Sequence, residues 1–423
     1  MVEYDVAVIG GGILGLTSAY YTKLSNPGFS VAVIEKEAEV GQGNTSRSVG
    51  GYRYGIFTSH VNRILSETSI NHFREAQESG EADLSMRDVG YLILLTKSRM
   101  ERLSKYLEGF VREGKGEIIK AEELRRSLRI VTSHKGDEEA ELMELEDIVA
   151  GLYAPRCGQL DVEKLVMMYK RRCISLGVEF LLGRRVESLQ LSPEKPLGIP
   201  REPRAWQKLT VSHVVAGGEA IRARQFIVAT GSWTPELLDP LGVDCFVKPK
   251  KRQVAVVKAS GGLEELLNLG GEVFKEMPMT FFPHGLYIAP RKGEKSFWVG
   301  LTDEIGRPFL LDLEAETSYY YDNIHPVLSK YMPAFSNSRP ENMWAGCYSM
   351  NNLDGNPIVF RFLNCVVVTG GSGSGVMKSD AVGRIAAAAV NGQKTAILHG
   401  GVPFDISVIG VEERRVDKEY LIL

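Results

Sequence analysis

Three glycines near the start of the chain constrain its fold more than any other feature. They form the pattern Gly10-x-Gly12-x-x-Gly15, which follows an apolar, β-branched run at 5–9 and opens a helical stretch at 16–24. In such a unit the first glycine permits a tight turn, the second lets the backbone approach a pyrophosphate, and the third allows close packing of helix on strand. The helix N-terminus offers amide donors and a favourable dipole to the phosphate. The pattern predicts a dinucleotide-binding turn; a purely structural glycine turn is the alternative.

The residues that follow this turn indicate which dinucleotide it holds. A second apolar run, 30–34, ends at Glu35, where a carboxylate can accept the hydroxyls of an adenosine ribose. A carboxylate there disfavours the phosphorylated ribose of NADP. Residues 41–48 then form a polar, glycine-bearing loop in place of the next strand and helix of a simple NAD dehydrogenase. Such a loop can wrap a longer cofactor and favours FAD, with an ordinary surface loop as the alternative.

Length, charge and cysteine usage narrow the class of protein. The 423 residues are too many for a single compact core, so two domains are expected. A formal net charge of −3 predicts no nucleic-acid partner and favours a small-molecule ligand. We expect no transmembrane segment and no signal peptide, and thus a cytoplasmic protein, with peripheral membrane contact left open. The absence of CxxC spacing predicts reduced thiols at all five cysteines, Cys157, Cys173, Cys245, Cys347 and Cys365.

Apolar periodicity divides the remaining chain into interleaved segments. The section 245–300 alternates as strands do, whereas 117–153 has the pattern of strand and loop. The segment 364–390 returns to strand, glycine-serine loop and alanine-rich helix, as in a nucleotide-binding unit. We therefore expect an α/β fold with a discontinuous Rossmann-like FAD-binding domain (1–85, 150–240 and 345–423) interleaved with an α+β substrate domain on a mostly antiparallel sheet (86–149 and 241–344).

Several dispersed motifs together resemble the FAD-dependent amine-oxidoreductase family, which includes sarcosine oxidase, glycine oxidase and D-amino-acid oxidase. The resemblance covers most of the chain. Within the family the chain looks most similar to archaeal dye-linked L-proline dehydrogenases and to the β subunits of sarcosine oxidase-like enzymes. Besides the glycine pattern and Glu35, the motifs are 43–53, 158–161, 227–233, 344–346 with 354–358, and 369–375.

This resemblance implies non-covalently bound FAD and assigns residues to it. The glycine pattern would hold the pyrophosphate, Glu35 the ribose, Val186 the adenine edge through its backbone, and the loop at 371–375 the flavin pyrimidine ring. Amides and the dipole of the following helix would stabilise the reduced cofactor there. A plain strand-to-helix turn is the alternative for that loop. The implied set is Gly10, Gly12, Ile13, Leu14, Gly15, Glu35, Lys36, Asn44, Thr45, Ser46, Arg47, Gly51, Val186, Ala229, Gly231, Trp233, Gly371, Gly373, Ser374, Gly375, Val376, Met377 and Lys378.

The resemblance also implies where a substrate binds. Arg53 matches a family arginine that reaches the substrate carboxylate, for which a guanidinium fork is well suited. Tyr348 lies near a family tyrosine of the pocket, while Arg291 and Lys378 each fall one place from a family cation that contacts substrate. The alternatives are a surface arginine for Arg53 and a half-buried tyrosine for Tyr348. Cys347 lies near a position of covalent flavin attachment in some sarcosine oxidases, which is the alternative to non-covalent FAD.

The expected reaction is oxidation of a secondary amino acid, with L-proline converted to 1-pyrroline-5-carboxylate. Trp298 and Thr302 stand where sarcosine oxidases carry a lysine and a histidine over the flavin. Without that fixed cation to stabilise superoxide, we expect electrons to pass to a dye, a quinone or another carrier. The alternatives are a sarcosine or glycine oxidase that uses oxygen, and a flavin-binding β subunit of a larger complex. An oligomer also remains open.

Overall fold

The computed structural model describes residues 3–302 and 306–421, in which two eight-stranded sheets dominate the architecture. The first sheet has the order β17-β18-β11-β1-β2-β8, and β10 and β9 extend it from β11 as an antiparallel ribbon. Its core strands β18, β11, β1, β2 and β8 run parallel. The strands are β1 (Glu3–Ile9), β2 (Val31–Ile34), β8 (Glu179–Leu181), β9 (Val186–Pro193), β10 (Leu209–Ala216), β11 (Glu219–Val228), β17 (Ile358–Phe362) and β18 (Cys365–Thr369).

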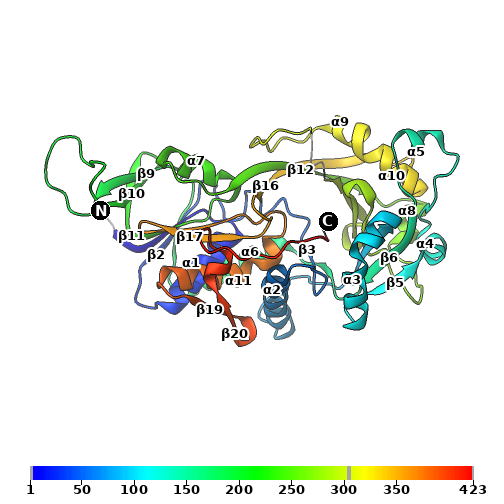
Figure 1. Cartoon of the computed structure of the whole chain (residues 1–423), viewed down its shortest axis with the longest axis horizontal. Helices are drawn as coiled ribbons and strands as arrows, with labels where there is room; N and C mark the ends of the chain where they lie inside the picture. Colours follow the sequence, from blue (N-terminus) through cyan, green and yellow to red (C-terminus); the bar gives the residue numbers. More distant parts are fainter. Residues whose placement is uncertain (1–2, 303–305, 422–423) are drawn as a thin grey trace.

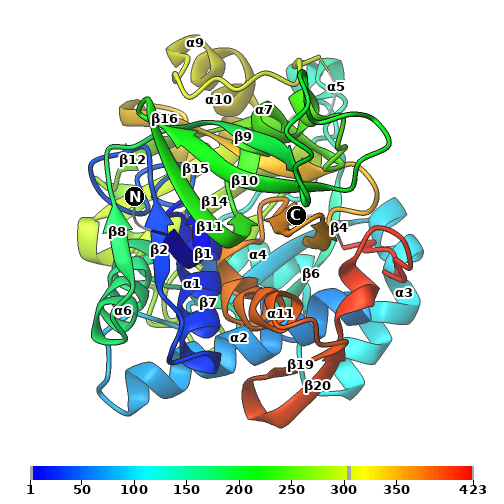
Figure 2. The ribbon, with the colours of Figure 1, turned by 90° about the vertical axis from the view of Figure 1, so that its left-hand side faces the viewer.

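The parallel strands are buried on both faces, as their unbroken apolar runs require. Every residue of β2 and of β18 is buried. On one face of the sheet, α1 and α11 pack against each other, while the β9–β10 ribbon contributes to the core on the other face (Figure 2). The helices of this unit are α1 (Ile13–Ser25), α2 (His60–Glu78), α6 (Val162–Ser175), α7 (Thr234–Leu238) and α11 (Ser379–Val390).

The second sheet has the order β16-β12-β15-β14-β13-β4-β6-β5 and is antiparallel except where β13 pairs with β4. One face packs on a core that includes residues of α4, α8, α9 and α10, and the other face packs on α3. The strands are β4 (Tyr91–Thr96), β5 (Glu117–Lys120), β6 (Ile148–Ala154), β12 (Val247–Lys258), β13 (Met279–Phe281), β14 (Leu286–Arg291), β15 (Ser296–Leu301) and β16 (Pro340–Asn351). The helices are α3 (Lys97–Arg112), α4 (Ala121–Leu128), α5 (Glu138–Leu142), α8 (Gly262–Leu266), α9 (Thr317–Tyr319) and α10 (His325–Tyr331).

The long strands β12 and β16 join the two halves of the molecule. They pair antiparallel from Val247 opposite Asn351 to Val257 opposite Pro340, and they run along the length of the molecule in Figure 1. The predicted domain boundaries at residues 150 and 345 cut through β6 and β16, both of which pair in the second sheet. Two short ribbons complete the structure, β3 (Gly51–Tyr52) with β7 (Gly158–Gln159) and β19 (Thr395–Leu398) with β20 (Val402–Asp405).

The predicted fold class is confirmed, with a Rossmann-like α/β unit and a mostly antiparallel second sheet. The prediction for 117–153 was wrong in two parts, because 121–128 form the helix α4 and 138–142 the helix α5 instead of strand or loop. The acidic first turn and basic last turn of α4 suit the helix dipole, and Leu124 and Leu128, one turn apart, are both buried. Within the described ranges, no helix combines the length and apolarity needed to cross a bilayer.

The contact between α1 and α11 supplies a test of this packing. A Cβ at Gly383 would lie 2.5 Å from the Thr17 Cβ and 2.7 Å from the Thr17 backbone carbon. Gly383→Ala should therefore lower the free energy of unfolding by about 1–3 kcal/mol, measured by urea denaturation. Gly109→Ala in α3 is the control, since a Cβ there meets nothing within 4 Å and should leave stability unchanged or slightly raised. Equal stability of both variants would contradict the packing described.

Candidate active site

A cavity of about 620 Å³ opens where the first sheet meets the second. Its lining includes the residues that follow the carboxyl ends of the parallel strands, such as Gly10 after β1, Glu35 after β2 and Ala229 after β11. This is the edge at which ligands bind in open α/β sheets. Residues of β12, β13, β14 and β16 close the opposite side. The cavity thus spans both units of the fold.

Backbone geometry requires glycine at two of the three fingerprint positions, and the third position opens onto the cavity. Gly10 has a φ of +104°, and a Cβ there would lie 2.6 Å from the Ala229 carbonyl oxygen. Gly12 opens onto the cavity at the start of α1. A Cβ at Gly15 would lie 1.9 Å from the Gly10 oxygen, so Gly15 brings α1 against the end of β1 without lining the cavity. The helix N-terminus therefore faces the cavity as an anion site.

The carboxylate of Glu35 is buried and lies on the cavity wall. Its Oε2 accepts a hydrogen bond from the Gly11 amide at 2.6 Å, and its Oε1 accepts one from the Glu37 amide at 2.9 Å. Nearby on the wall, the Lys36 ammonium lies 4.0 Å from the centre of the Trp233 ring, and Val186 begins β9. A fixed carboxylate beside apolar walls suits the ribose and adenine of a dinucleotide.

The loop that follows Glu35 ties the second sheet to the first. The Asn44 Oδ1 accepts from the Cys347 amide at 2.8 Å, and its Nδ2 donates to the Ser232 hydroxyl at 3.1 Å. Ser232 in turn donates to the Cys347 carbonyl at 2.6 Å. The Cys347 thiol donates to the Asp312 carbonyl at 3.2 Å. Ser46 does not line the cavity, and its hydroxyl donates to the Gly43 carbonyl at 3.2 Å.

Tyr348 and the glycine-serine loop 371–375 lie against each other in the cavity. Gly373 has a φ of +80°, and a Cβ there would lie 2.5 Å from the Tyr348 ring. Burial raises the pKa of Tyr348, so its hydroxyl stays protonated and able to donate. The Arg252 guanidinium, on β12, lies 5.5 Å from the centre of the same ring. This end of the cavity therefore joins the loop of the first unit to the second sheet.

Lys378 lies behind the loop 371–375 rather than on the cavity wall. It ends the short turn η7 (Val376–Lys378), and its side chain is 1% exposed. The ammonium donates to the Ser374 hydroxyl at 2.7 Å and to the Asn62 side-chain oxygen. Burial, reinforced by the nearby Arg53 guanidinium, lowers the pKa of Lys378 to about 7. The neighbouring residue Met377 faces the cavity instead.

Arg53 brings a buried positive charge to the cavity. Its guanidinium carbon lies 3.9 Å from the centre of the Phe57 ring, and its Nη1 donates to the Leu421 carbonyl at 2.7 Å. Burial lowers the pKa of Arg53, and the carboxylate of Glu419 opposes that shift. Both Arg53 and Glu419 line the cavity. The Arg53 amide also lies 3.4 Å from the Met377 sulfur, so Arg53 stands beside the turn that follows the loop 371–375.

Arg291 and Trp298 form a separate cluster that does not line the cavity. The Arg291 guanidinium carbon lies 3.8 Å from the Trp298 ring centre, and Arg291 donates to the Val49 carbonyl. Trp298 packs edge-on against Trp344, whose indole N–H donates to the Arg47 carbonyl at 3.0 Å. The cluster therefore contacts the backbone of the loop that carries Arg47.

Most residues that the sequence singles out meet in this one cavity. All of the predicted cofactor and substrate residues line it except Gly15, Ser46, Arg291 and Lys378. Residues that no motif predicts also line it, among them Arg252, Tyr287 and Glu419. Arg252 left no distinct signal in the sequence, since it follows Lys248, Lys250 and Lys251 in a basic run at the start of β12 (Val247–Lys258). Glu419 left none.

The wall described above fits FAD. It offers an anion cradle with no side chain at Gly10 and Gly12, a buried carboxylate at Glu35, and a glycine-serine loop at the far end. The distance between these features is spanned by one continuous cavity of about 620 Å³. A long dinucleotide cofactor needs such an elongated site.

Known proteins resemble this chain in sequence and in fold. The FAD-dependent oxidoreductase domain-containing protein 1 of Bos taurus is 25% identical over 415 residues, which cover 90% of this chain and 80% of that protein. The solved structure of L-proline dehydrogenase from P. horikoshii has a TM-score of 0.71 at 22% identity and covers 92% of this chain and 94% of its own. Glycine oxidase from Geobacillus kaustophilus has a TM-score of 0.74 at 18% identity, covering 98% and 100%. The two structures share the fold with this chain.

The family follows from a match that spans almost the whole chain. Residues 5–389 match the family described as FAD dependent oxidoreductase. That range includes the glycine fingerprint, Glu35 and the loop 371–375 of the cavity. The chain therefore belongs to the family of FAD-dependent oxidoreductases, and FAD is its cofactor.

Proposed function

We propose that this protein oxidises the carbon–nitrogen bond of a secondary amino acid, with L-proline converted to 1-pyrroline-5-carboxylate as the favoured reaction. The observation that carries the proposal is Arg53, a buried guanidinium at the end of the cavity next to the glycine-serine loop. A buried cation that opens onto a ligand cavity calls for an anionic partner, and an amino-acid carboxylate is one. The similarity to L-proline dehydrogenase and glycine oxidase in fold is consistent with this substrate class.

The residues of the elongated cavity divide between cofactor and substrate. The glycine fingerprint and α1 bind the pyrophosphate, Glu35 and Val186 contact the adenosine, and the loop 371–375 approaches the flavin. When bound, FAD supplies the acceptor for the two electrons and the hydrogen removed from the carbon next to the substrate nitrogen. We propose that it is bound non-covalently, because the Cys347 thiol donates to the carbonyls of Leu310 and Asp312, neither of which lines the cavity.

Two side chains act on the substrate in this proposal. Arg53 binds the carboxylate and so orients the carbon–nitrogen bond, while the protonated hydroxyl of Tyr348 closes the pocket from β16. Lys378 acts indirectly, because its ammonium holds Ser374 and Asn62 from behind the loop. Arg291 likewise acts indirectly by holding the Val49 carbonyl. The apolar wall around Phe57 excludes water and strengthens the pairing of Arg53 with a carboxylate.

The surroundings of Trp298 support a proposal for the electron acceptor. Trp298 stands where oxygen-using relatives carry a lysine, and Lys295 does not replace that charge, because its side chain is 73% exposed and lies 3.7 Å from Glu264. The Arg291 cation is covered by the Trp298 ring and does not line the cavity. We propose that electrons pass to a dye in vitro and to a quinone or another carrier in the cell.

Arg53 can be tested by comparing substrates with and without a carboxylate. Arg53→Ala should lose about 2–4 kcal/mol in kcat/KM for L-proline, because the substrate carboxylate is left buried without its charged partner. The loss should nearly vanish for pyrrolidine, which lacks the carboxylate. Arg291→Ala is the control and should affect both compounds alike. An equal loss for both compounds in Arg53→Ala would assign that residue to the flavin or the fold.

The acceptor can be tested by stopped-flow reoxidation of the substrate-reduced protein. Reaction with dichlorophenolindophenol should be fast and reaction with air-saturated buffer slow, because Trp298 is uncharged where oxygen-using relatives carry the lysine that stabilises superoxide. Trp298→Lys should accelerate the reaction with oxygen, with Trp206→Lys at an exposed position as the control. Oxygen that reoxidises the wild-type protein as fast as the dye, with stoichiometric peroxide, would make it an oxidase.

A further inference from the structure

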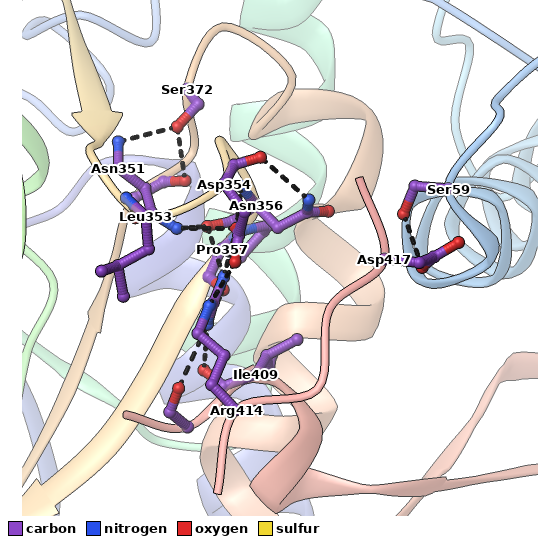
Figure 3. A network of polar contacts seen from close by, with 12 residues as sticks. Ser59, Asn351, Leu353, Asp354, Asn356, Pro357, Ser372, Ile409, Arg414 and Asp417 are labelled. Carbon is purple, nitrogen blue, oxygen red and sulfur yellow. Dashed lines mark hydrogen bonds and ion pairs between the residues drawn. The ribbon is translucent and has the colours of Figure 1, made fainter. Parts of the chain in front are cut away.

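The segment 411–421, here called the C-terminal strap, begins on the first unit of the fold. The Arg414 guanidinium forms a two-pronged ion pair with Asp354, with Nε to Oδ2 at 2.6 Å and Nη2 to Oδ1 at 2.7 Å (Figure 3). Arg414 also donates to the Ile409 carbonyl at 2.9 Å. Its side chain is 8% exposed and that of Asp354 is 16% exposed. The origin of the strap is therefore fixed beside the turn between β16 and β17.

Two carboxylates then fasten the strap to the N-terminus of α2. Asp417 accepts from the Ser59 hydroxyl at 3.0 Å, as Figure 3 shows, and from the Val61 amide at 3.3 Å. Glu419 accepts from the Thr58 amide at 3.1 Å through Oε1 and from the Ser59 amide at 3.2 Å through Oε2. The first amides of a helix have no partner within the helix and favour negative charge. These contacts therefore hold the strap firmly.

The strap ends on the second unit, next to the candidate substrate site. Tyr420 stacks on Tyr106 of α3, with ring centres 5.8 Å apart. Leu421 is fully buried in the apolar cluster beneath β4 and α3, and its carbonyl accepts from Arg53. Figure 1 shows the C-terminal segment crossing between the two halves of the molecule. One short segment thus connects α2, α3 and Arg53.

The hydrogen bond from Arg53 to the Leu421 carbonyl leaves the positive charge of Arg53 available to a ligand. Within residues 3–302 and 306–421, the Leu421 carbonyl is the one acceptor that the Arg53 side chain has. A neutral carbonyl orients a guanidinium without neutralising it, whereas a carboxylate in the same place would pair with it. The Glu419 carboxylate acts on the Arg53 charge only through space, because its oxygens are engaged by donors of Thr58, Ser59 and Asn62. Because the Leu421 carbonyl already holds one edge of the guanidinium, Arg53 loses less side-chain entropy when it binds a carboxylate.

We propose that Glu419 is a positioning residue of the substrate site. It fastens the strap to α2 so that the Leu421 carbonyl orients Arg53 toward the carboxylate of the substrate. The inference rests on the proposed function, since it assumes that Arg53 binds a carboxylate. The opposite relation, in which the strap competes with the substrate for Arg53, predicts the opposite sign in the experiment below.

The test uses the full-length, FAD-loaded protein and Glu419→Ala, with Glu413→Ala, an exposed position of the strap, as the matched control. The first readout is binding of pyrrole-2-carboxylate, a planar carboxylate with no hydrogen to transfer, by titration calorimetry. Glu419→Ala should weaken binding about 5- to 10-fold, the loss expected of one orienting hydrogen bond. Glu413→Ala should bind as the wild type does. Glu419→Gln keeps the size of the side chain and replaces the alanine variant if that variant folds poorly. Its affinity for the probe should lie between those of Glu419→Ala and the wild type.

Two further readouts separate positioning from general stability. Hydrogen exchange at the amides of residues 58–61 should be faster in Glu419→Ala, which reports release of the strap. The KM for L-proline should rise by about the same factor as the dissociation constant of pyrrole-2-carboxylate. The kcat/KM for pyrrolidine should be unchanged. Unchanged or tighter carboxylate binding despite faster exchange would overturn the inference. Failure of the wild type itself to bind the probe would instead reject the carboxylate site of the proposed function, and the inference with it.

Discussion

The contact between α1 and the end of β1 is the constraint on which the site depends. Gly15 brings α1 so close to the Gly10 carbonyl that no side chain fits between them. A Cβ at Gly15 would lie 1.9 Å from that oxygen. This approach aims the first amides of α1 at the space beyond the strand ends. Every parallel strand of the first sheet ends at the same edge, so the helix N-terminus, Glu35 and the loop after β18 share one cavity.

The second sheet supplies the opposite wall of that cavity. The pairing of β12 with β16 carries Arg252 and Tyr348 across to the loop 371–375. Asn44 then joins the cofactor loop to β16 through the Cys347 amide. The end of the cavity that we propose for the substrate is thus built from both units, and its geometry depends on how rigidly they are joined. The C-terminal strap is a third connection between them.

The sequence allowed the fold and the cofactor end to be predicted because both depend on local patterns. Gly10, Gly12 and Gly15 act within one turn, and the parallel strands are continuous apolar runs. The substrate end depends on contacts between distant segments, so Arg252 and Glu419 carried no motif. The short turn η7 places Met377 on the cavity wall and Lys378 behind the loop. Sequence spacing alone does not reveal which of these two neighbours faces the cavity.

The account joins one cofactor, one buried arginine and one class of substrate, and an anaerobic spectral titration tests all three at once. The visible spectrum of the FAD-loaded protein is recorded without oxygen while L-proline is added. The account predicts that the absorption of oxidised flavin bleaches fully, with two electrons taken up per flavin. A spectrum that stays unchanged with L-proline, sarcosine and glycine, in protein whose flavin is still reduced by dithionite, would contradict it.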